Sequence, residues 1–265
     1  MLRFAISVIP VVLAAQDIVS FPSGRLTLRG VLYKPAGSGP FPGVIYNHGS
    51  GSDYSKQFEA LGRVFTSRGW VFFAPYRRGQ GLSESAGRNI GEQVREAEAR
   101  EGETAARKTL VRILETDHLD DQLAALAWLR MAPFVDTRRI AVAGNSFGGI
   151  ETMLGAESGS YCAAVDSAGA AQTWARSPEV QTLMIRAARK ARIPVFFFQA
   201  ENDFDLSPSR ILAQTMQETG KKFKLKIFPE FGISKEDGHS FGYFGASTWA
   251  GDVFEFLEEN CPRAR

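Results

Sequence analysis

Apolar and polar residues alternate with a period of two near the start of the chain. Residues 17–35, DIVSFPSGRLTLRGVLYKP, show this alternation on both sides of a Pro-Ser-Gly turn. A strand with one buried face has this period, and a turn between two such strands is typical of a β-hairpin. The sequence therefore predicts an antiparallel hairpin here, with Pro35 ending its second strand.

Short runs that are apolar at nearly every position follow the hairpin. Strands that are buried on both faces of a parallel sheet have this composition. The runs are GVIYNHG, WVFFAPY, RIAVAGNS, AAVDSAG, IPVFFFQA and FKLKIFPE, which begin at residues 43, 70, 139, 163, 193 and 223. Together with the hairpin they predict an eight-stranded, mostly parallel sheet.

Amphipathic segments of helix length separate these runs. Strands that alternate with helices indicate a doubly wound α/β sheet. Two start signals support helices that begin at Asp117 and Ser207. Asp117 lies three residues before Asp120, as in a capping box, and Ser207 is followed by Pro208 at the first helical position. Four of the segments are residues 55–67, 117–131, 207–219 and 247–259.

Residues 84–115 form a helical insert after the strand near residues 70–76. Charges in it fall at helical pairing distance, such as Glu96 with Arg100. Most of these side chains are interpreted as a solvated helix surface. The alternative is an insert that covers the active site with its apolar face. That face would consist of Val94, Leu110 and Leu114.

A second, smaller insert spans residues 170–192. Trp174 and Met184 within it could line a substrate pocket. Large apolar side chains are more often buried in a core, so we expect core packing for both.

Length and composition favour one domain that acts on a small molecule. The chain has 265 residues, 44% of them hydrophobic and 23% charged, which suits a single α/β domain over residues 16–265. The formal net charge is +2, and both signs are spread along the chain. This distribution offers no basic stripe for nucleic acid. Neither pattern nor composition indicates an oligomeric state.

Residues 1–15 resemble a secretory signal peptide. Arg3 precedes an apolar run that ends in small residues at Ala14 and Ala15. The run is too short to span a bilayer, so we expect no stable membrane insertion. The alternative is an N-terminal strand or helix packed on the fold. Export to the periplasm or the medium follows from the first interpretation, and a cytoplasmic location from the second.

The chain has two cysteines, Cys162 and Cys261. Neither has metal-like spacing or a neighbouring histidine, so we expect no zinc site. They are either two buried thiols or one disulfide, and export would favour the disulfide.

Ser146 lies in Gly144-Asn145-Ser146-Phe147-Gly148, a match to G-x-S-x-G between a predicted strand and a predicted helix. That context is the one in which the motif forms a sharp turn that exposes a nucleophilic serine. The backbone amide of Phe147 would face the same space at the helix N-terminus. Ser146 is therefore the candidate nucleophile, with Phe147 as a candidate oxyanion donor.

A serine nucleophile needs a base, and the chain contains three histidines. His48, in NHGSG, follows a strand directly and is interpreted as part of a loop that places a backbone amide at the site. His118, beside acidic residues, is interpreted as a surface group at a helix end. His239, between the last strand and the last helix, is the candidate base.

The base needs an acid that holds its ring, and that acid should follow the preceding strand. Asp203, Asp205 and Glu201 all lie there. Asp203 fits the expected loop register best, which leaves Asp205 as a surface or capping residue. A second amide for the oxyanion is expected from the HGSG loop, at Ser50.

These features resemble the α/β-hydrolases, more narrowly the dienelactone hydrolase and prolyl-oligopeptidase-like branch. The matching segments include GVIYNHGSG, APYRRGQGLS, VAGNSFGGIET, FFFQAENDFDLSP and DGHSFG. The resemblance implies a serine hydrolase that uses Ser146, Asp203 and His239 without a metal or organic cofactor. Relatives that hydrolyse dienelactone commonly carry cysteine at the nucleophile, so a carboxylic ester of a small molecule is the expected substrate. Alternatives are a small peptidase, a thioesterase, or a non-catalytic ligand-binding protein.

Overall fold

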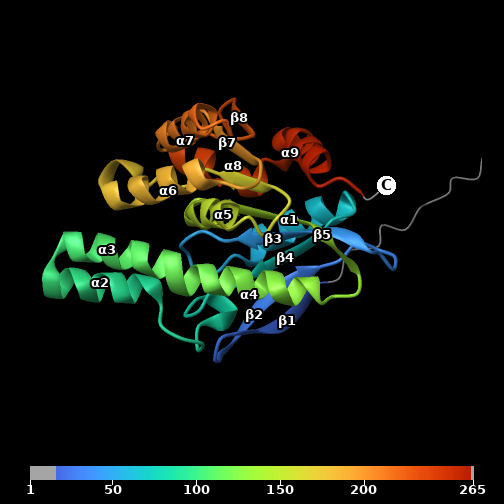
Figure 1. Ribbon diagram of the computed structural model, residues 1–265, viewed down its shortest axis with the longest axis horizontal. Coiled ribbons are helices and arrows are strands. Elements are labelled where there is room, and N and C mark those ends of the chain that lie inside the picture. The colour runs from blue at the N-terminus through green and yellow to red at the C-terminus, as the bar shows by residue number, and fades with distance from the viewer. Residues whose placement is uncertain (1–15, 264–265) are drawn as a thin grey trace, which may run out of the picture.

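The computed structural model describes residues 16–263, which form an eight-stranded sheet in the order β1-β2-β4-β3-β5-β6-β7-β8 (Figure 1). The predicted signal peptide, residues 1–15, lies outside the described residues. The strands are β1 Gln16–Ser23, β2 Leu26–Tyr33, β3 Phe41–Asn47, β4 Val71–Pro75, β5 Val135–Asn145, β6 Ala164–Ser167, β7 Val195–Ala200 and β8 Phe223–Phe228.

Strand direction divides the sheet into two parts. β1 pairs antiparallel with β2, and β2 pairs antiparallel with β4. Every pair from β4 across to β8 is parallel. The predicted N-terminal hairpin and the mostly parallel, doubly wound α/β-hydrolase sheet are therefore confirmed.

Helices cover both faces of the sheet, and successive residues of each central strand point to opposite faces. In β7, Phe196 and Phe198 belong to the core on the face covered by α1, α8 and α9, whereas Phe197 belongs to the core on the face covered by α4 to α7. This burial on both faces explains why the strands read as unbroken apolar runs. The helices are α1 Ser55–Ser67, α2 Ile90–Glu101, α3 Glu103–Ile113, α4 Leu119–Arg130, α5 Phe147–Ser158, α6 Pro178–Lys190, α7 Ser207–Glu218, α8 Lys235–Phe244 and α9 Ala246–Asn260.

The predicted helical insert is a hairpin of α2 and α3, broken at Gly102, whose φ of 84° favours glycine. Figure 1 shows the hairpin extending from the body of the molecule beside α6. Leu114, which the alternative interpretation placed on a face covering the active site, is fully buried in the core instead. Trp174 and Met184 also lie in the core, as expected.

The helix predicted to begin at Asp117 begins at Leu119 instead. A π-helical turn, Leu114–His118, joins α3 to α4 without a break, so this end needs no cap. Asp117 forms an ion pair with Arg78, at 2.7 Å, rather than capping a helix.

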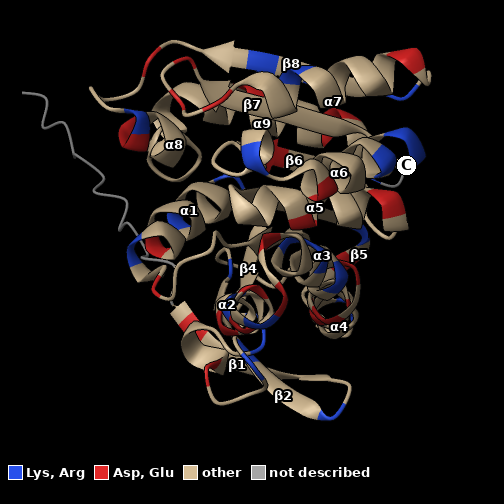
Figure 2. Cartoon of the chain, turned by 90° about the vertical axis from the view of Figure 1, so that its left-hand side faces the viewer, with Lys and Arg blue, Asp and Glu red and all other residues tan. Residues whose placement is uncertain are grey.

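Cys162 and Cys261 form a disulfide, which resolves the two alternatives left by the sequence. The bridge ties the chain after α9 to the segment that precedes β6. Arg139 Nε donates to the carbonyl oxygen of Cys261 at 2.6 Å. None of the helices within residues 16–263 has the length and apolar character needed to cross a membrane. Basic and acidic residues are interspersed over the helices in Figure 2.

Candidate active site

Ser146 occupies the turn between β5 and α5 with φ 60° and ψ −118°. A non-glycine residue in this region is strained, and such strain is found at nucleophile turns. The glycines of the motif allow the turn to form. A Cβ at Gly144 would overlap the carbonyl of Gly148, and a Cβ at Gly148 would overlap the carbonyl of Asn47. The turn is thus packed directly against the end of β3.

His239 and Asp203 lie beside Ser146. His239 Nε2 is 2.8 Å from Ser146 Oγ, and His239 Nδ1 is 2.8 Å from Asp203 Oδ1. The three residues come from the ends of β5 and β7 and from α8. The structure therefore brings together the three side chains that the sequence singled out, in one hydrogen-bonded chain.

The Asp203 carboxylate is held by two further donors. Gln199 Nε2 donates to Oδ2 at 2.7 Å, and the Phe204 amide donates to Oδ1 at 2.7 Å. Asp205 does not contact His239; its Oδ1 accepts from the amide of Ser207 at the start of α7. Asp205 therefore lies at the start of a helix, where the sequence analysis expected a surface or capping residue.

His239 lies one turn inside a helix, not on the loop that the sequence suggested. Residues 234–237, SKED, form a capping box in which the Ser234 side chain accepts from the Asp237 amide and Asp237 reaches back to Ser234. This Ser-x-x-Asp spacing is a readable start signal for α8. The backbone of His239 is therefore part of a hydrogen-bonded helix.

The HGSG loop after β3 presents three successive amides. Those of Gly49 and Gly51 donate to the hydroxyls of Tyr243 and Tyr54, at 3.1 and 2.8 Å. No residue that the structure describes accepts from the Ser50 amide between them. The amide of Phe147, in the first turn of α5, has no intrahelical acceptor either.

His118, expected at the surface, is buried and only 1% exposed. Its Nδ1 lies 3.0 Å from Glu151 Oε1, and its ring packs edge-on against Phe147. The π-helical turn before α4 adds a residue to the helix and rotates His118 inward, which the charged neighbours in the sequence concealed. His48 is also buried, and desolvation holds the pKa of its imidazole well below the ordinary value.

Asp166, at the end of β6, is a buried carboxyl that the sequence analysis did not single out. Burial raises its pKa to about 7. Its Oδ1 accepts from the Gly169 amide at 3.0 Å, and a Cβ at Gly149 would overlap the same oxygen. An aspartate inside an apolar strand, AAVDSAG, is the signal that could have drawn attention to it.

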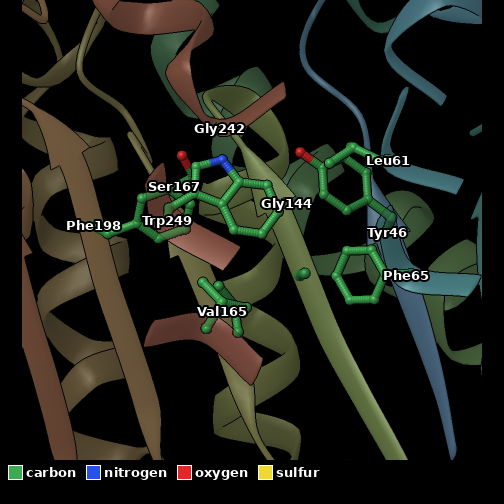
Figure 3. A pocket seen from close by; sticks show the side chains of 11 residues that line it. Tyr46, Leu61, Phe65, Gly144, Val165, Ser167, Phe198, Gly242 and Trp249 are labelled. Atoms are coloured by element: carbon green, nitrogen blue, oxygen red, sulfur yellow. The ribbon is translucent and has the colours of Figure 1, made fainter. Parts of the chain in front are cut away.

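Two cavities lie near the site. The one in Figure 3 is an apolar void of about 10 Å³ behind Gly144, between the sheet and α1, α8 and α9, with room for no more than about one water. The other is an open groove of about 510 Å³ that contains Phe204, whose ring lies 5.4 Å from that of His239. The groove is lined by Ala171, Gln172, Ala175, Arg176, Phe204 and Asp205.

This arrangement combines a hydroxyl, an imidazole and a carboxylate in one chain with two backbone amides nearby. Such a set can move a proton from the hydroxyl to the ring and donate hydrogen bonds to a developing oxyanion. Within residues 16–263 no three His, Cys, Asp or Glu side chains gather in a way that could hold a metal ion.

Comparison with known proteins identifies the family. The family model described as the dienelactone hydrolase family matches residues 28–245, more than half of the chain. The chain belongs to the dienelactone hydrolase family. This confirms the resemblance drawn from the sequence motifs. A comparison with curated protein sequences finds no match.

Solved structures show how widely this dienelactone hydrolase family chain shares its fold. An acylaminoacyl peptidase from Pyrococcus horikoshii is 18% identical with a TM-score of 0.67, over 96% of this chain and 43% of that one. A Klebsiella pneumoniae protein assigned as a dienelactone hydrolase is 18% identical with a TM-score of 0.66, over 94% and 99%. An esterase from Pyrococcus furiosus is 15% identical with a TM-score of 0.64, over 94% and 92%. At these identities the likeness shows the fold alone.

Proposed function

We propose that the protein is a serine hydrolase that cleaves carboxylic esters of small molecules through an acyl-enzyme. The observation that carries this proposal is the hydrogen-bonded chain from Ser146 Oγ through His239 to Asp203, with 2.8 Å at each link. Membership of the dienelactone hydrolase family supports hydrolase activity.

Acylation begins when His239 Nε2 takes the proton of the Ser146 hydroxyl. Ser146 Oγ then attacks the ester carbonyl carbon, and the carbonyl oxygen becomes an oxyanion. The amides of Phe147 and Ser50 donate to that oxyanion, which stabilises the tetrahedral intermediate more than the ground state. The imidazolium returns the proton to the leaving alcohol as the ester bond breaks.

Deacylation repeats these steps with water. His239 removes a proton from a water molecule, whose oxygen attacks the acyl carbon, and Ser146 leaves with the proton as the acid is released. Asp203 stays ionised throughout, keeps Nδ1 protonated and stabilises the imidazolium. The reaction needs no metal or organic cofactor. The open groove beside Phe204 has a volume, about 510 Å³, suited to a small ester.

A small peptidase or a thioesterase could use the same three side chains. The structural likeness to an acylaminoacyl peptidase is the observation that favours the peptidase alternative. A non-catalytic ligand-binding protein ranks behind both, because none of the three side chains is replaced. Aminoacyl p-nitroanilides and acyl-CoA substrates separate these enzymes from an esterase.

The experiment is turnover of p-nitrophenyl acetate and butyrate by the wild type and by Ser146→Ala. We expect the variant to lose roughly 10⁴ to 10⁶ in kcat, since residues that act as one unit fail together. Ser158→Ala, at the opposite end of α5, is the matched control and should keep wild-type activity. Undiminished activity in Ser146→Ala would refute the proposed nucleophile.

We also propose that the protein works in an oxidising compartment, outside the cytoplasm. The disulfide between Cys162 and Cys261 and the signal-like composition of residues 1–15 support this. The intact mass of protein made in its own host measures both features. Loss of the leader and of two hydrogens is expected, and a reduced, uncleaved chain would contradict export.

A further inference from the structure

Arg77, two residues after the end of β4, is a buried guanidinium whose five N–H groups all donate hydrogen bonds. Its exposed fraction is 5%. Two of the acceptors are carbonyl oxygens of the HGSG loop, and the others are side chains. Nε donates to Gln80 Oε1 at 2.8 Å, Nη1 to Glu151 Oε2 at 2.6 Å and His48 O at 2.8 Å, and Nη2 to His48 Nδ1 at 2.8 Å and Gly49 O at 2.5 Å.

We propose that Arg77 is a positioning residue for the oxyanion hole, a role that rests on the function proposed above. The carbonyl of Gly49 and the N–H of Ser50 belong to one peptide group. Because that group is planar and trans, its C=O and N–H point in opposite directions. Holding the Gly49 oxygen inside the protein therefore directs the Ser50 N–H outward, toward the space beside Ser146.

The same guanidinium also contacts the second oxyanion donor. Its centre lies 4.8 Å from the Phe147 ring centroid, and its partner Glu151 follows Phe147 by one turn on α5. Arg77 thus connects the loop after β3 to the first turn of α5. The two amides that would bind one oxygen atom are fixed relative to each other through this one side chain.

The positive charge of Arg77 also strengthens the Ser50 N–H as a hydrogen-bond donor. A cation at the Gly49 oxygen draws electron density along the peptide, which makes the Ser50 N–H a better donor to a negative oxygen. Glu151 neutralises the buried guanidinium at 2.6 Å, so the cation can remain away from water. His48 takes part as an acceptor, since Arg77 Nη2 can only donate to its Nδ1. This requires a neutral imidazole.

Lysine cannot reproduce this arrangement. An ammonium group has three donors around a single atom, whereas the guanidinium serves five acceptors from a rigid plane. Arg77→Lys keeps the positive charge and most of the volume but must release at least two acceptors. The Gly49 peptide can then rotate, and the Ser50 N–H loses its fixed direction.

The test is Arg77→Lys, measured on p-nitrophenyl butyrate and with a trifluoromethyl ketone. That inhibitor forms a tetrahedral adduct with a serine nucleophile and places an oxyanion in the hole. We expect kcat to fall by about 10- to 100-fold, because losing one oxyanion donor completely costs ~10²- to 10³-fold. Inhibitor affinity should fall in proportion, while KM changes by less than about 3-fold.

Arg78→Lys is the matched control. This neighbouring arginine forms ion pairs with Asp117, in the π-helical turn before α4, and with Asp121, in α4. It does not contact the HGSG loop. It should lose stability without a proportional loss of inhibitor affinity. Wild-type kcat and inhibitor affinity in Arg77→Lys, or a change in KM alone, would overturn the positioning role.

Gln80→Met provides a second variant if Arg77→Lys does not give a cooperative thermal transition. The substitution removes the oxygen that accepts from Arg77 Nε, and also the weak hydrogen bond of 3.3 Å from Gln80 Nε2 to the Ser50 carbonyl. The charges of Arg77 and Glu151 are left as they are. We expect a kcat loss of about 3- to 10-fold with a parallel loss of inhibitor affinity, as a partial displacement would give. Wild-type kcat together with wild-type inhibitor affinity in this variant would count against the proposal. Fluorophosphonate labelling of wild-type Ser146 separates this outcome from a failure of the proposed function.

Discussion

His239 Nδ1 lies 2.8 Å from Asp203 Oδ1, and the Asp203 carboxylate is closed off from solvent. A buried carboxylate in this position selects the ring tautomer that leaves Nε2 free to accept a proton from Ser146. The pairing joins a loop after β7 to a helix that follows β8. Asp205 does not take the place of Asp203, since its carboxylate is engaged at the start of α7.

Asp203→Asn should leave the fold intact and lower kcat on p-nitrophenyl butyrate by about 10⁴-fold, because the amide favours the wrong tautomer. Steady-state kinetics on the purified variant measure this. Asp205→Asn is the comparison from the same loop. Because Asp205 lines the groove, its KM can change, but its kcat should stay within about 3-fold of the wild type. Equal losses in the two variants would mean that Asp203 is not the orienting acid.

Gly148→Ala tests the close approach of the serine turn to β3. Its added Cβ would overlap the Asn47 carbonyl, which is backbone and cannot move aside cheaply. We expect the free energy of unfolding to fall by about 2 kcal/mol or more, and kcat to fall by ~10²-fold as the Phe147 amide is displaced. Urea unfolding and ester turnover report the two effects.

Gly251→Ala is the control for that substitution. No atom outside its own helix lies within 4 Å of a Cβ at this position in α9. Helix propensity then predicts a neutral or slightly stabilising change, by up to ~1 kcal/mol. A stable, fully active Gly148→Ala variant would show that the turn does not depend on this contact.

Asp166 should make stability fall as pH rises. Burial raises its pKa from 3.8 to about 7 in the folded protein. Below about pH 4 the carboxyl is neutral in both the folded and unfolded states, so its ionisation does not lower the free energy of unfolding. Between about pH 4 and 7 the unfolded chain ionises while the folded one does not, so the free energy of unfolding decreases, by roughly 4 kcal/mol in total.

Asp166→Asn removes this dependence, although the amide brings its own pH-independent cost in the buried site. The measurement is urea unfolding of both proteins at intervals from pH 4 to 8. The variant's stability relative to wild type should improve as pH rises to about 7 and then level off. A difference that is the same at every pH would contradict the raised pKa.

The disulfide should contribute stability without affecting chemistry. Its cysteines are 99 residues apart, and closing a loop of about this length in the unfolded chain is worth roughly 4 kcal/mol. The double variant Cys162→Ser, Cys261→Ser should lose that amount in urea unfolding. Its kcat at 25 °C should be unchanged, because the bridge lies at the amino ends of β5 and β6, away from Ser146. Unaltered stability would refute this contribution.

The positions along the chain of the strands and of the three candidate catalytic residues could be predicted, because local sequence patterns mark each of them. Apolar runs located the strands, and the G-x-S-x-G motif located Ser146 between β5 and α5. The acid and the base followed from the loops after the last two strands. In an open α/β sheet the site lies at the carboxyl ends of the strands, so the loops that follow the strands are the places where the acid and the base are expected.

Features that depend on tertiary packing could not be predicted in the same way. His118 has charged neighbours that suggest exposure, yet the π-helical turn directs it to Glu151. The role of Arg77 depends on five acceptors from three separate segments, which no local pattern brings together. The burial of Leu114 in the core could not be predicted either, because an amphipathic helix does not reveal what its apolar face packs against.

Covalent labelling tests the central claim most directly. A fluorophosphonate reacts with a serine only where a base and an oxyanion hole activate it. We predict stoichiometric labelling of the wild type, mapped by peptide mass spectrometry to Ser146, and no label in Ser146→Ala. A wild-type protein that remains unlabelled, or a label on another residue, would contradict the account.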